Sequence, residues 1–241
     1  EQKAKGEKDE PIVIEEFPGL EGEVEWDPRP ISRNGSERVI KFAFNLARHR
    51  HRKRGVSQSV TCVDKSNVTR GCRLFRGIFN EISEQNPDIE THAAYIDAFT
   101  MWLMRDPEDL DVVVLPNMFG DIATDLASVL QGGLGMAASA NLGPEHMMFE
   151  PVHGSAPKYT GKNVVNPIAT LQSVQMMFEA LAYRKKDEDL DKCADVLQKA
   201  IQQHFEEGGV VTYDLGGDAS TSEVGQAIAD RCKIMLEEEF Q

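Results

Sequence analysis

The sequence predicts an α/β fold, in which helices cover both faces of a sheet. A near-continuous apolar run at 110–115 contains three consecutive valines, which is typical of a strand buried on both faces. Other short apolar segments alternate with stretches in which apolar residues recur at helical spacing. With 241 residues, of which 41% are hydrophobic, the chain can bury a sizeable core.

Strands and helices alternate through the first half of the chain. Ser36 is the expected N-cap of a helix whose apolar positions from Val39 to Ala47 recur at helical spacing. A second helix, with apolar positions at 74–82, is expected to end near Pro87. The remaining elements expected in this half are strands at 60–63, 92–96 and 110–115, and a short helix at 100–104.

The second half is expected to be mostly helical. A helix should start at about Asp121, directly after the valine-rich strand, and a Gly-rich segment at 132–143 should follow it. The sequence then predicts one strand at 147–152 and helices at 167–181, 188–205 and 222–239.

Composition excludes several classes of function. The formal charge is −14, from 26 Lys+Arg against 40 Asp+Glu, so the field of the protein repels nucleic acids and anionic lipid surfaces. One basic run, Arg48 to Arg54, could be an anion site. Because it lies at the end of a predicted helix, where cations complement the dipole, we interpret it as a solvated helix terminus.

The cysteines and the hydropathy pattern indicate an intracellular protein. Cys62, Cys72, Cys193 and Cys232 are far apart and form no C-x-x-C pair, which argues against structural zinc and against a disulfide framework. No apolar stretch reaches the roughly 18 residues of a membrane span, and the first ten residues are highly charged, unlike a secretory signal. We therefore expect a location in the cytoplasm or the mitochondrial matrix.

Two aspartates follow the valine-rich strand at a spacing that suits metal binding. In PNMFGDIATDLASVL, Asp121 and Asp125 are four residues apart, so their carboxylates would project from one helical face. This face lies beyond the C-terminal end of a strand, where α/β proteins place ligands. An all-oxygen site suits Mg²⁺ or Mn²⁺. For the pair alone, simple compensation of the dipole of the first helical turn remains an alternative.

Longer motifs resemble those of the isocitrate/isopropylmalate dehydrogenase family. NMFGDIATD resembles its metal-binding signature, GLGMAASANLG the Gly-rich turn that follows, and FEPVHGSAPKYTGKNVVNPIAT its cofactor loop. VTCVDKSNV resembles the strand with the catalytic lysine, YIDAFTMWLMRDPEDLDVVV the segment with a third metal aspartate, and TYDLGGDASTSEVGQAI the motif that closes over the adenosine. The likeness runs from about Glu21 to the C-terminus. It implies the family's fold, a mixed sheet flanked by helices, without its N-terminal part.

The resemblance implies roles for four residues. Asp121 and Asp125 become metal ligands, and Asp97 becomes a metal ligand in the catalytic site of the partner subunit. Lys65 becomes a catalytic lysine, also contributed across the dimer, which relays a proton. The implied reaction is the oxidation and decarboxylation of 2-hydroxy dicarboxylic or tricarboxylic acids of the isocitrate, 3-isopropylmalate or D-malate type, with NAD(P) and Mg²⁺ or Mn²⁺.

The same resemblance identifies the residues expected to bind the cofactor. The family's loop around adenine and ribose is matched by His153, Gly154, Ser155, Ala156 and Pro157. Asn166 matches an asparagine that contacts adenine. No G-x-G-x-x-G motif follows a strand, so this assignment depends on the family resemblance and not on a general phosphate-binding loop.

Three residues indicate NADP rather than NAD. Members of the family that use NAD place an acidic residue where Lys158 stands, whereas members that use NADP have Lys-Tyr, as in Lys158 and Tyr159. A cation and a phenol would attract a 2′-phosphate that a carboxylate would repel. Tyr213 matches another position typical of NADP use, while Gly217 departs from the arginine often found with it.

The segment before residue 21 departs from the family pattern. A motif of Arg-Glu-Asn type and a catalytic tyrosine are expected before GLEGEVEW, but the sequence is DEPIVIEEFPGLEGE, with Phe17 in place of the tyrosine. No arginine precedes Arg29, so anchors for substrate carboxylates are missing and the isolated chain should have little activity. Either another chain supplies these groups, or the protein is a catalytically inactive accessory or structural subunit of a larger complex. The metal aspartates and Lys65 favour retained chemistry.

The family pattern predicts three regions and an oligomer. Residues 1–20 form a divergent N-terminal extension, 21–132 a small dimerisation and metal-site domain, and 133–241 the C-terminal half of the cofactor-binding domain. The chain is expected to form a homodimer, or a hetero-oligomer with a related subunit, through about 31–129, because Lys65 and Asp97 act only if they reach a neighbouring site.

Overall fold

The α/β fold predicted from the sequence is confirmed. The computed structural model describes residues 27–239, so Phe17 and the motif around it lie outside the described residues. The helices are α1 (Arg33–Arg54), α2 (Arg70–Glu84), α3 (Ile96–Arg105), α4 (Asn117–Ser128), α5 (Ile168–Lys185), α6 (Glu188–Glu206) and α7 (Thr221–Glu239). The strands are β1 (Ser59–Asp64), β2 (Glu90–Tyr95), β3 (Val112–Val114), β4 (Ala138–Leu142) and β5 (Met147–Pro151).

The first lobe is a three-layer unit around a parallel sheet with strand order β2-β1-β3. All six residues of the central strand β1 are buried. Side chains alternate across a strand, so Val60 and Cys62 pack in the core formed with α1 and α2, whereas Val63 packs with α3 and α4 on the other face. Because the three strands are parallel, their carboxyl ends lie at one edge of the sheet. The loops at this edge carry Lys65 and lead into α3 and α4.

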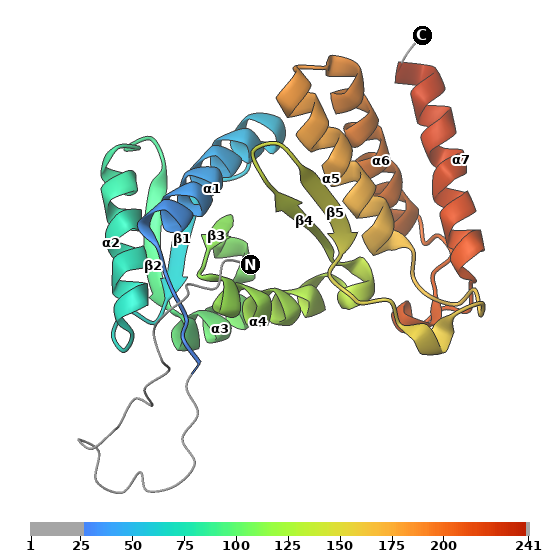
Figure 1. Ribbon diagram of the computed structural model, residues 1–241. Coiled ribbons are helices and arrows are strands. Elements are labelled where there is room, and N and C mark those ends of the chain that lie inside the picture. Colours follow the sequence, from blue (N-terminus) through green and yellow to red (C-terminus); the bar gives the residue numbers. More distant parts are fainter. Residues whose placement is uncertain (1–26, 240–241) are drawn as a thin grey trace, which may run out of the picture.

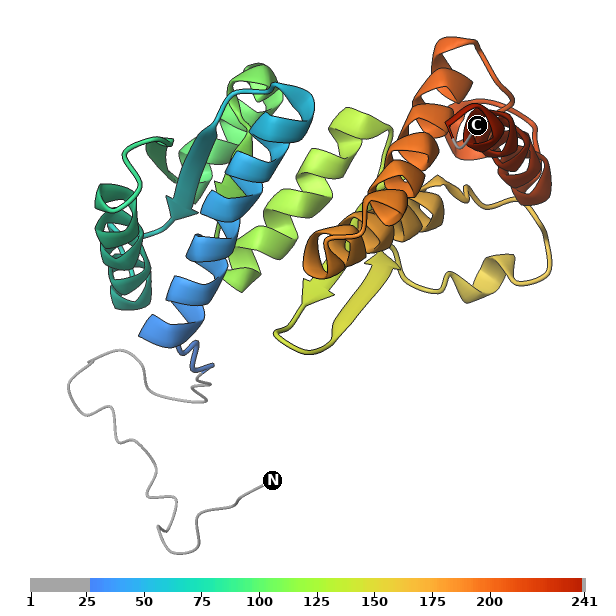
Figure 2. The ribbon, with the colours of Figure 1, turned by 90° about the horizontal axis from the view of Figure 1, so that it is seen from above.

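The second lobe contains α5, α6, α7 and the antiparallel hairpin β4–β5, which packs against α5 (Figure 1). Its core is built from Ile168 on α5, Ala200 and Ile201 on α6, and Val224 and Ile228 on α7. In Figure 2, α4 lies between the other helices of the first lobe and the helices of the second lobe. Among residues 27–239, no helix combines the length and the apolar character needed to cross a membrane.

The basic run at the end of α1 joins the two lobes. Its interpretation as a solvated terminus is wrong for Lys53, whose Nζ lies 2.7 Å from an Asp191 carboxylate oxygen and 2.9 Å from one of Asp195, both on α6. His49 Nε2 lies 2.9 Å from a carboxylate oxygen of Glu179 on α5. Burial by itself would lower the pKa of Lys53, but the surrounding carboxylates raise it, which keeps this contact charged.

The structure differs from the sequence prediction at several places, among them the N-cap of α1, the start of α4 and the Gly-rich segment. Ser36 is not the N-cap of α1, because the helix begins earlier and the Ser32 hydroxyl accepts a hydrogen bond from the Gly35 amide (3.2 Å). Ser36 lies inside the helix, where its hydroxyl donates to the Ser32 carbonyl (2.8 Å). The helix expected from Asp121 begins at Asn117, and the Gly-rich segment contains a strand, β4, that was not predicted.

Candidate functional site

Lys65 and Asp97 meet at the carboxyl edge of the parallel sheet. Lys65 directly follows β1, and Asp97 lies in the first turn of α3, which directly follows β2. Because β1 and β2 are parallel neighbours in register, with Asp64 beside Tyr95, their following residues emerge together. Lys65 Nζ lies 2.6 Å from Asp97 Oδ1. The hydrogen bond from Lys65 lowers the pKa of the Asp97 carboxyl, which is ionised at neutral pH.

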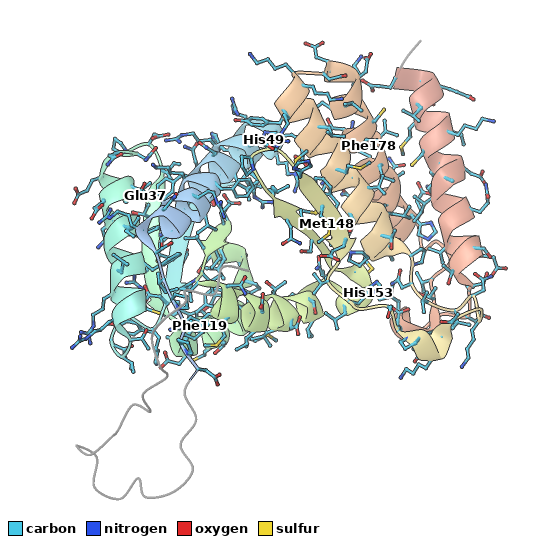
Figure 3. All side chains as sticks on the ribbon, viewed as in Figure 1. Glu37, His49, Phe119, Met148, His153 and Phe178 are labelled. Atoms are coloured by element: carbon cyan, nitrogen blue, oxygen red, sulfur yellow. The ribbon has the colours of Figure 1, made fainter. Side chains whose placement is uncertain are left out.

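Asp121 and Asp125 project from α4 near the same edge. Asp121 is the fifth residue of the helix, and no acidic residue stands in the first turn, so compensation of the first-turn dipole does not explain the pair. Both side chains are exposed. The Asn117 amide, one turn earlier, donates to Asp121 Oδ2 (3.2 Å) and orients that carboxylate. Figure 3 labels Phe119, near the beginning of this helix, beside the first lobe.

The three aspartates do not converge within one chain. In the part of the chain that the structure describes, no group of three or more histidine, cysteine, aspartate or glutamate side chains is close enough to hold a metal ion. Asp97 is paired with Lys65 of its own chain, whereas Asp121 and Asp125 stand apart on α4. The chain therefore presents two half-sites, one with an amine and a carboxylate and the other with two carboxylates. Metal binding by all three stays a prediction.

The predicted cofactor loop leaves the end of β5. His153 is half-buried, and its Nδ1 donates to the Gly154 carbonyl (2.8 Å). Ala156 adopts a left-handed conformation with φ 43°, and a short 3₁₀ turn, Pro157–Tyr159, follows. Figure 3 places His153 in the second lobe, in the loop that connects the hairpin to α5. Nucleotide binding by this loop stays a prediction.

Aromatic and cationic side chains gather beside this loop. The rings of Tyr159 and Tyr213 lie with their centroids 6.1 Å apart, although 54 residues separate them in sequence (213 minus 159). Lys158 Nζ lies 5.0 Å from the centroid of the Tyr159 ring, and Lys162 Nζ lies 5.7 Å from it. The Tyr213 phenol and the Lys158 cation lower the pKa of Tyr159. Lys162, which was not among the expected cofactor residues, adds a second cation to the group.

Asn166 connects the cofactor loop to the turn that carries Tyr213. It is buried, its side-chain oxygen accepts from the Ile168 amide at the start of α5 (3.0 Å), and its Nδ2 donates to Asp214 Oδ2 (3.0 Å). Asp214, next to Tyr213, also accepts a hydrogen bond from Thr212. Asp214 was not among the expected site residues, because its partner lies 48 residues away in sequence. Contact of Asn166 with adenine stays a prediction.

Gly217 has a steric reason for being glycine. A Cβ atom added at this position would lie 2.1 Å from the carbonyl oxygen of Val211. That oxygen accepts a hydrogen bond from the Ala219 amide (3.1 Å), which closes the turn around Tyr213. The arginine that the family motif often has at this position would therefore collide with the Val211 carbonyl.

Comparison with known proteins shows the family. Residues 6–228 match the model of the family described as isocitrate/isopropylmalate dehydrogenase. The chain is 42% identical over 224 residues to a 3-isopropylmalate/3-methylmalate dehydrogenase of Methanocaldococcus jannaschii, a match that covers 90% of this chain and 64% of that protein. It is 43% identical over 202 residues to an isocitrate dehydrogenase [NADP] of Thermus thermophilus, covering 82% of this chain and 38% of that protein.

A solved structure agrees with this result. The crystal structure of isocitrate dehydrogenase from Methylococcus capsulatus superposes with a TM-score of 0.76 and 38% sequence identity, covering 85% of this chain and 58% of that one. The crystal structure of a β-decarboxylating dehydrogenase from Thermococcus kodakarensis superposes with a TM-score of 0.75 and 36% sequence identity, covering 88% of this chain and 59% of that one. The chain belongs to the isocitrate/isopropylmalate dehydrogenase family. It spans 59–64% of the length of four archaeal relatives at 40–42% identity.

Proposed function

We propose that this chain forms part of an NAD(P)-dependent dehydrogenase that oxidises and decarboxylates a 2-hydroxy dicarboxylic or tricarboxylic acid. The observation that carries this proposal is the Lys65–Asp97 pair, held at 2.6 Å on the sheet edge from which α4 also presents Asp121 and Asp125. These are the groups that such a reaction needs: an amine that can move a proton and carboxylates that can hold a divalent cation.

The donor set fits Mg²⁺ or Mn²⁺. Asp97, Asp121 and Asp125 offer only oxygen atoms, and hard divalent cations prefer oxygen ligands. A cation held by these residues would act as a Lewis acid toward the oxygen atoms of the substrate. Lys65 is placed by its contact with Asp97, where its amine can take up or return a proton.

A second subunit would complete the site. Asp97 and Lys65 form one half-site, Asp121 and Asp125 form the other, and no described residues of a single chain join the halves into a metal cluster. Large apolar side chains are exposed on the two helices that carry the aspartates: Met101, Trp102, Met104, Met118 and Ile122. An apolar surface of this kind favours burial against a partner. We propose a dimer in which each subunit contributes its Lys65 and Asp97 to the neighbour's pair of aspartates.

Replacing Asp121 with asparagine should weaken Mn²⁺ binding by the native oligomer at least tenfold, equivalent to about 1.4 kcal/mol. The amide keeps the shape of the carboxylate but removes its negative charge. Calorimetric titration measures the affinity. Asp109→Asn, which neutralises another exposed aspartate of the same lobe, is the matched control and should bind Mn²⁺ as the unmodified protein does. Equal affinity in both variants would remove Asp121 from the metal site.

The cations beside Tyr159 favour NADP as the cofactor. Lys158 and Lys162 both lie within 6 Å of that ring's centroid, so a 2′-phosphate at this place would meet two positive charges. The relative from Thermus thermophilus carries NADP in its name. We therefore propose that NADP binds more tightly than NAD.

Lys158→Asp should remove the preference for NADP, because a carboxylate repels the 2′-phosphate and can accept hydrogen bonds from the ribose hydroxyls of NAD. The affinities for NADP and NAD are measured by fluorescence titration of the oligomer. Lys199→Asp, an equal change of charge on the exposed surface of α6, should leave their ratio unchanged. Equal affinity for the two cofactors before any substitution would contradict the proposal.

A catalytically inactive accessory subunit is the second candidate function. Phe17 stands where the family pattern has a catalytic tyrosine, and its ring has no hydroxyl to donate a proton to an enolate. This alternative predicts that the native assembly binds metal and cofactor through this chain but turns over without using Lys65. Cofactor reduction with isocitrate, 3-isopropylmalate, D-malate and tartrate, measured for the native assembly with and without Lys65→Met, separates the two functions.

A further inference from the structure

A buried ion pair lies directly beneath Lys65. Asp64, the last residue of β1, is fully buried, and its Oδ2 accepts a hydrogen bond from Arg76 Nε on α2 (2.8 Å). The same guanidinium donates from Nη2 to the Ala94 carbonyl near the end of β2 (2.9 Å). One side chain from α2 therefore ties together the carboxyl ends of two neighbouring strands.

These contacts surround the backbone of Lys65. Asp64 Oδ1 accepts from the Ser66 amide (2.7 Å), so the Asp64 carboxylate spans the peptide units on both sides of Lys65. The Lys65 carbonyl accepts from the amides of Val68 (3.0 Å) and Thr69 (2.9 Å). The backbone around Lys65 is thus held by Asp64 at the end of the sheet and by the turn that follows.

Arg76 also holds the end of β2, which leads to Asp97, the partner of Lys65. Ala94, which Arg76 holds, stands three residues before Asp97, and α3 begins between them at Ile96. A shift of the β2 end relative to the β1 end would therefore change the 2.6 Å separation of Lys65 Nζ and Asp97 Oδ1 directly. Arg76 adds a side-chain link between the two ends, beside the backbone pairing of β1 with β2.

Stability alone is a weak explanation for such a pair. Removing two charges from water costs free energy that their attraction repays only when the geometry is very good, and apolar replacements of buried ion pairs are often neutral or stabilising. What a planar guanidinium adds is direction, because its fork holds two acceptors in fixed positions and an ammonium cannot. Groups of this kind, behind a reacting side chain, hold that side chain in its productive geometry.

We propose that Arg76 and Asp64 are positioning residues for Lys65: they set the distance between the Lys65 amine and the Asp97 carboxylate. The inference rests on the proposed function for its effect on turnover, and on geometry alone for its effect on Lys65. In this proposal neither residue contacts a ligand, and Asp64 is fully buried. They act through the ends of β1 and β2.

The test uses Arg76→Lys, which keeps the charge but cannot hold both acceptors, and the double variant Asp64→Asn/Arg76→Gln, which removes both charges together. The double variant guards against unfolding, because removing one partner of a buried pair leaves the other charge uncompensated. Arg33→Lys is the matched control, since Arg33 also makes a two-pronged contact, with Glu81, but at an exposed position between α1 and α2.

Two readouts separate positioning from folding. The first is the rate at which an amine-acylating reagent modifies Lys65 in the presence of a chelator, measured by mass spectrometry. Lys41 is the internal reference, because it is also paired with a carboxylate, that of Glu37. The second is the split between kcat and KM in the native assembly. We expect Arg76→Lys to raise the labelling rate of Lys65 severalfold and to lower kcat by about 10²-fold, with KM for the cofactor unchanged.

The outcomes are decisive in each case. A folded Arg76→Lys protein with unchanged labelling of Lys65 and unchanged kcat would overturn the inference. A loss of kcat that only follows the melting temperature across the three variants, without a change in labelling, would make the pair structural and would overturn it as well. If the unmodified assembly shows no turnover, the proposed function fails, while the labelling of Lys65 still decides the positioning role.

Discussion

Replacing Gly217 with alanine or arginine is expected to destabilise the protein by about 3 kcal/mol, the upper end of the usual cost of overpacking. Any Cβ at this position would lie 2.1 Å from the Val211 carbonyl oxygen, so the turn must open and lose the hydrogen bond from the Ala219 amide (3.1 Å). Tyr213 stands within this turn. The arginine variant should therefore bind NADP more weakly, although the added cation would by itself attract a phosphate.

Chemical denaturation and cofactor titration of the two Gly217 variants measure these effects. Gly225→Ala is the control, because a Cβ there meets nothing within 4 Å and the residue lies within α7. In a helix, alanine is favoured over glycine by roughly 0.5–1 kcal/mol, so the control should be slightly more stable. A Gly217→Arg protein with unchanged stability and tighter NADP binding would contradict this description of the turn.

Replacing Lys65 with methionine should lower kcat of the native assembly by about 10²–10⁴-fold, the usual contribution of a positioned proton donor or acceptor. Methionine keeps much of the length of the side chain but has no proton to exchange. Stability should change little, because the partner Asp97 is an exposed residue at the start of α3. Cofactor affinity should also be unchanged, since Lys65 lies in the first lobe and the cofactor loop in the second.

Steady-state kinetics at saturating metal and cofactor measure this loss. Lys41→Met is the control, because Lys41 is also a lysine of the first lobe paired with a carboxylate, Glu37, at an exposed position (3.4 Å). Normal turnover by the Lys65→Met assembly would favour the accessory function, in which another chain carries out the chemistry.

The sequence predicted the order and type of most elements because their signals are local. The valine-rich run and the helical spacing of apolar residues are visible within short windows, and the corresponding strand and helices are present. The N-cap of α1 was misplaced by four residues because Ser32 and Ser36 have the same capping chemistry. Strand β4 was missed because its alanines and its asparagine carry little strand signal, and only its pairing with β5 defines it.

In the candidate site too, the local features were predicted and the contacts between distant residues were not. The spacing of Asp121 and Asp125 is local, and the resemblance to family motifs identified Lys65 and Asp97 before their 2.6 Å contact was known. The residues that hold the site together were not predicted: Asp64, Arg76, Lys162 and Asp214. Each acts through a partner distant in sequence or through a turn whose shape the sequence pattern does not specify. A single aspartate or arginine in a helix or loop is usually solvated, so nothing marks these residues in advance.

We propose that the metal site is shared, with Asp97 from one subunit and Asp121 and Asp125 from the other. Mn²⁺ binding by mixed subunits tests it most directly, with Asp97→Asn subunits combined with Asp121→Asn/Asp125→Asn subunits after dissociation and reassembly. Each variant alone should bind Mn²⁺ weakly. In the mixture, about one quarter of the sites should regain tight binding, because half of the dimers are hybrids and each hybrid has one intact site of two. Weak binding throughout the mixture would show that the three carboxylates do not act across a dimer.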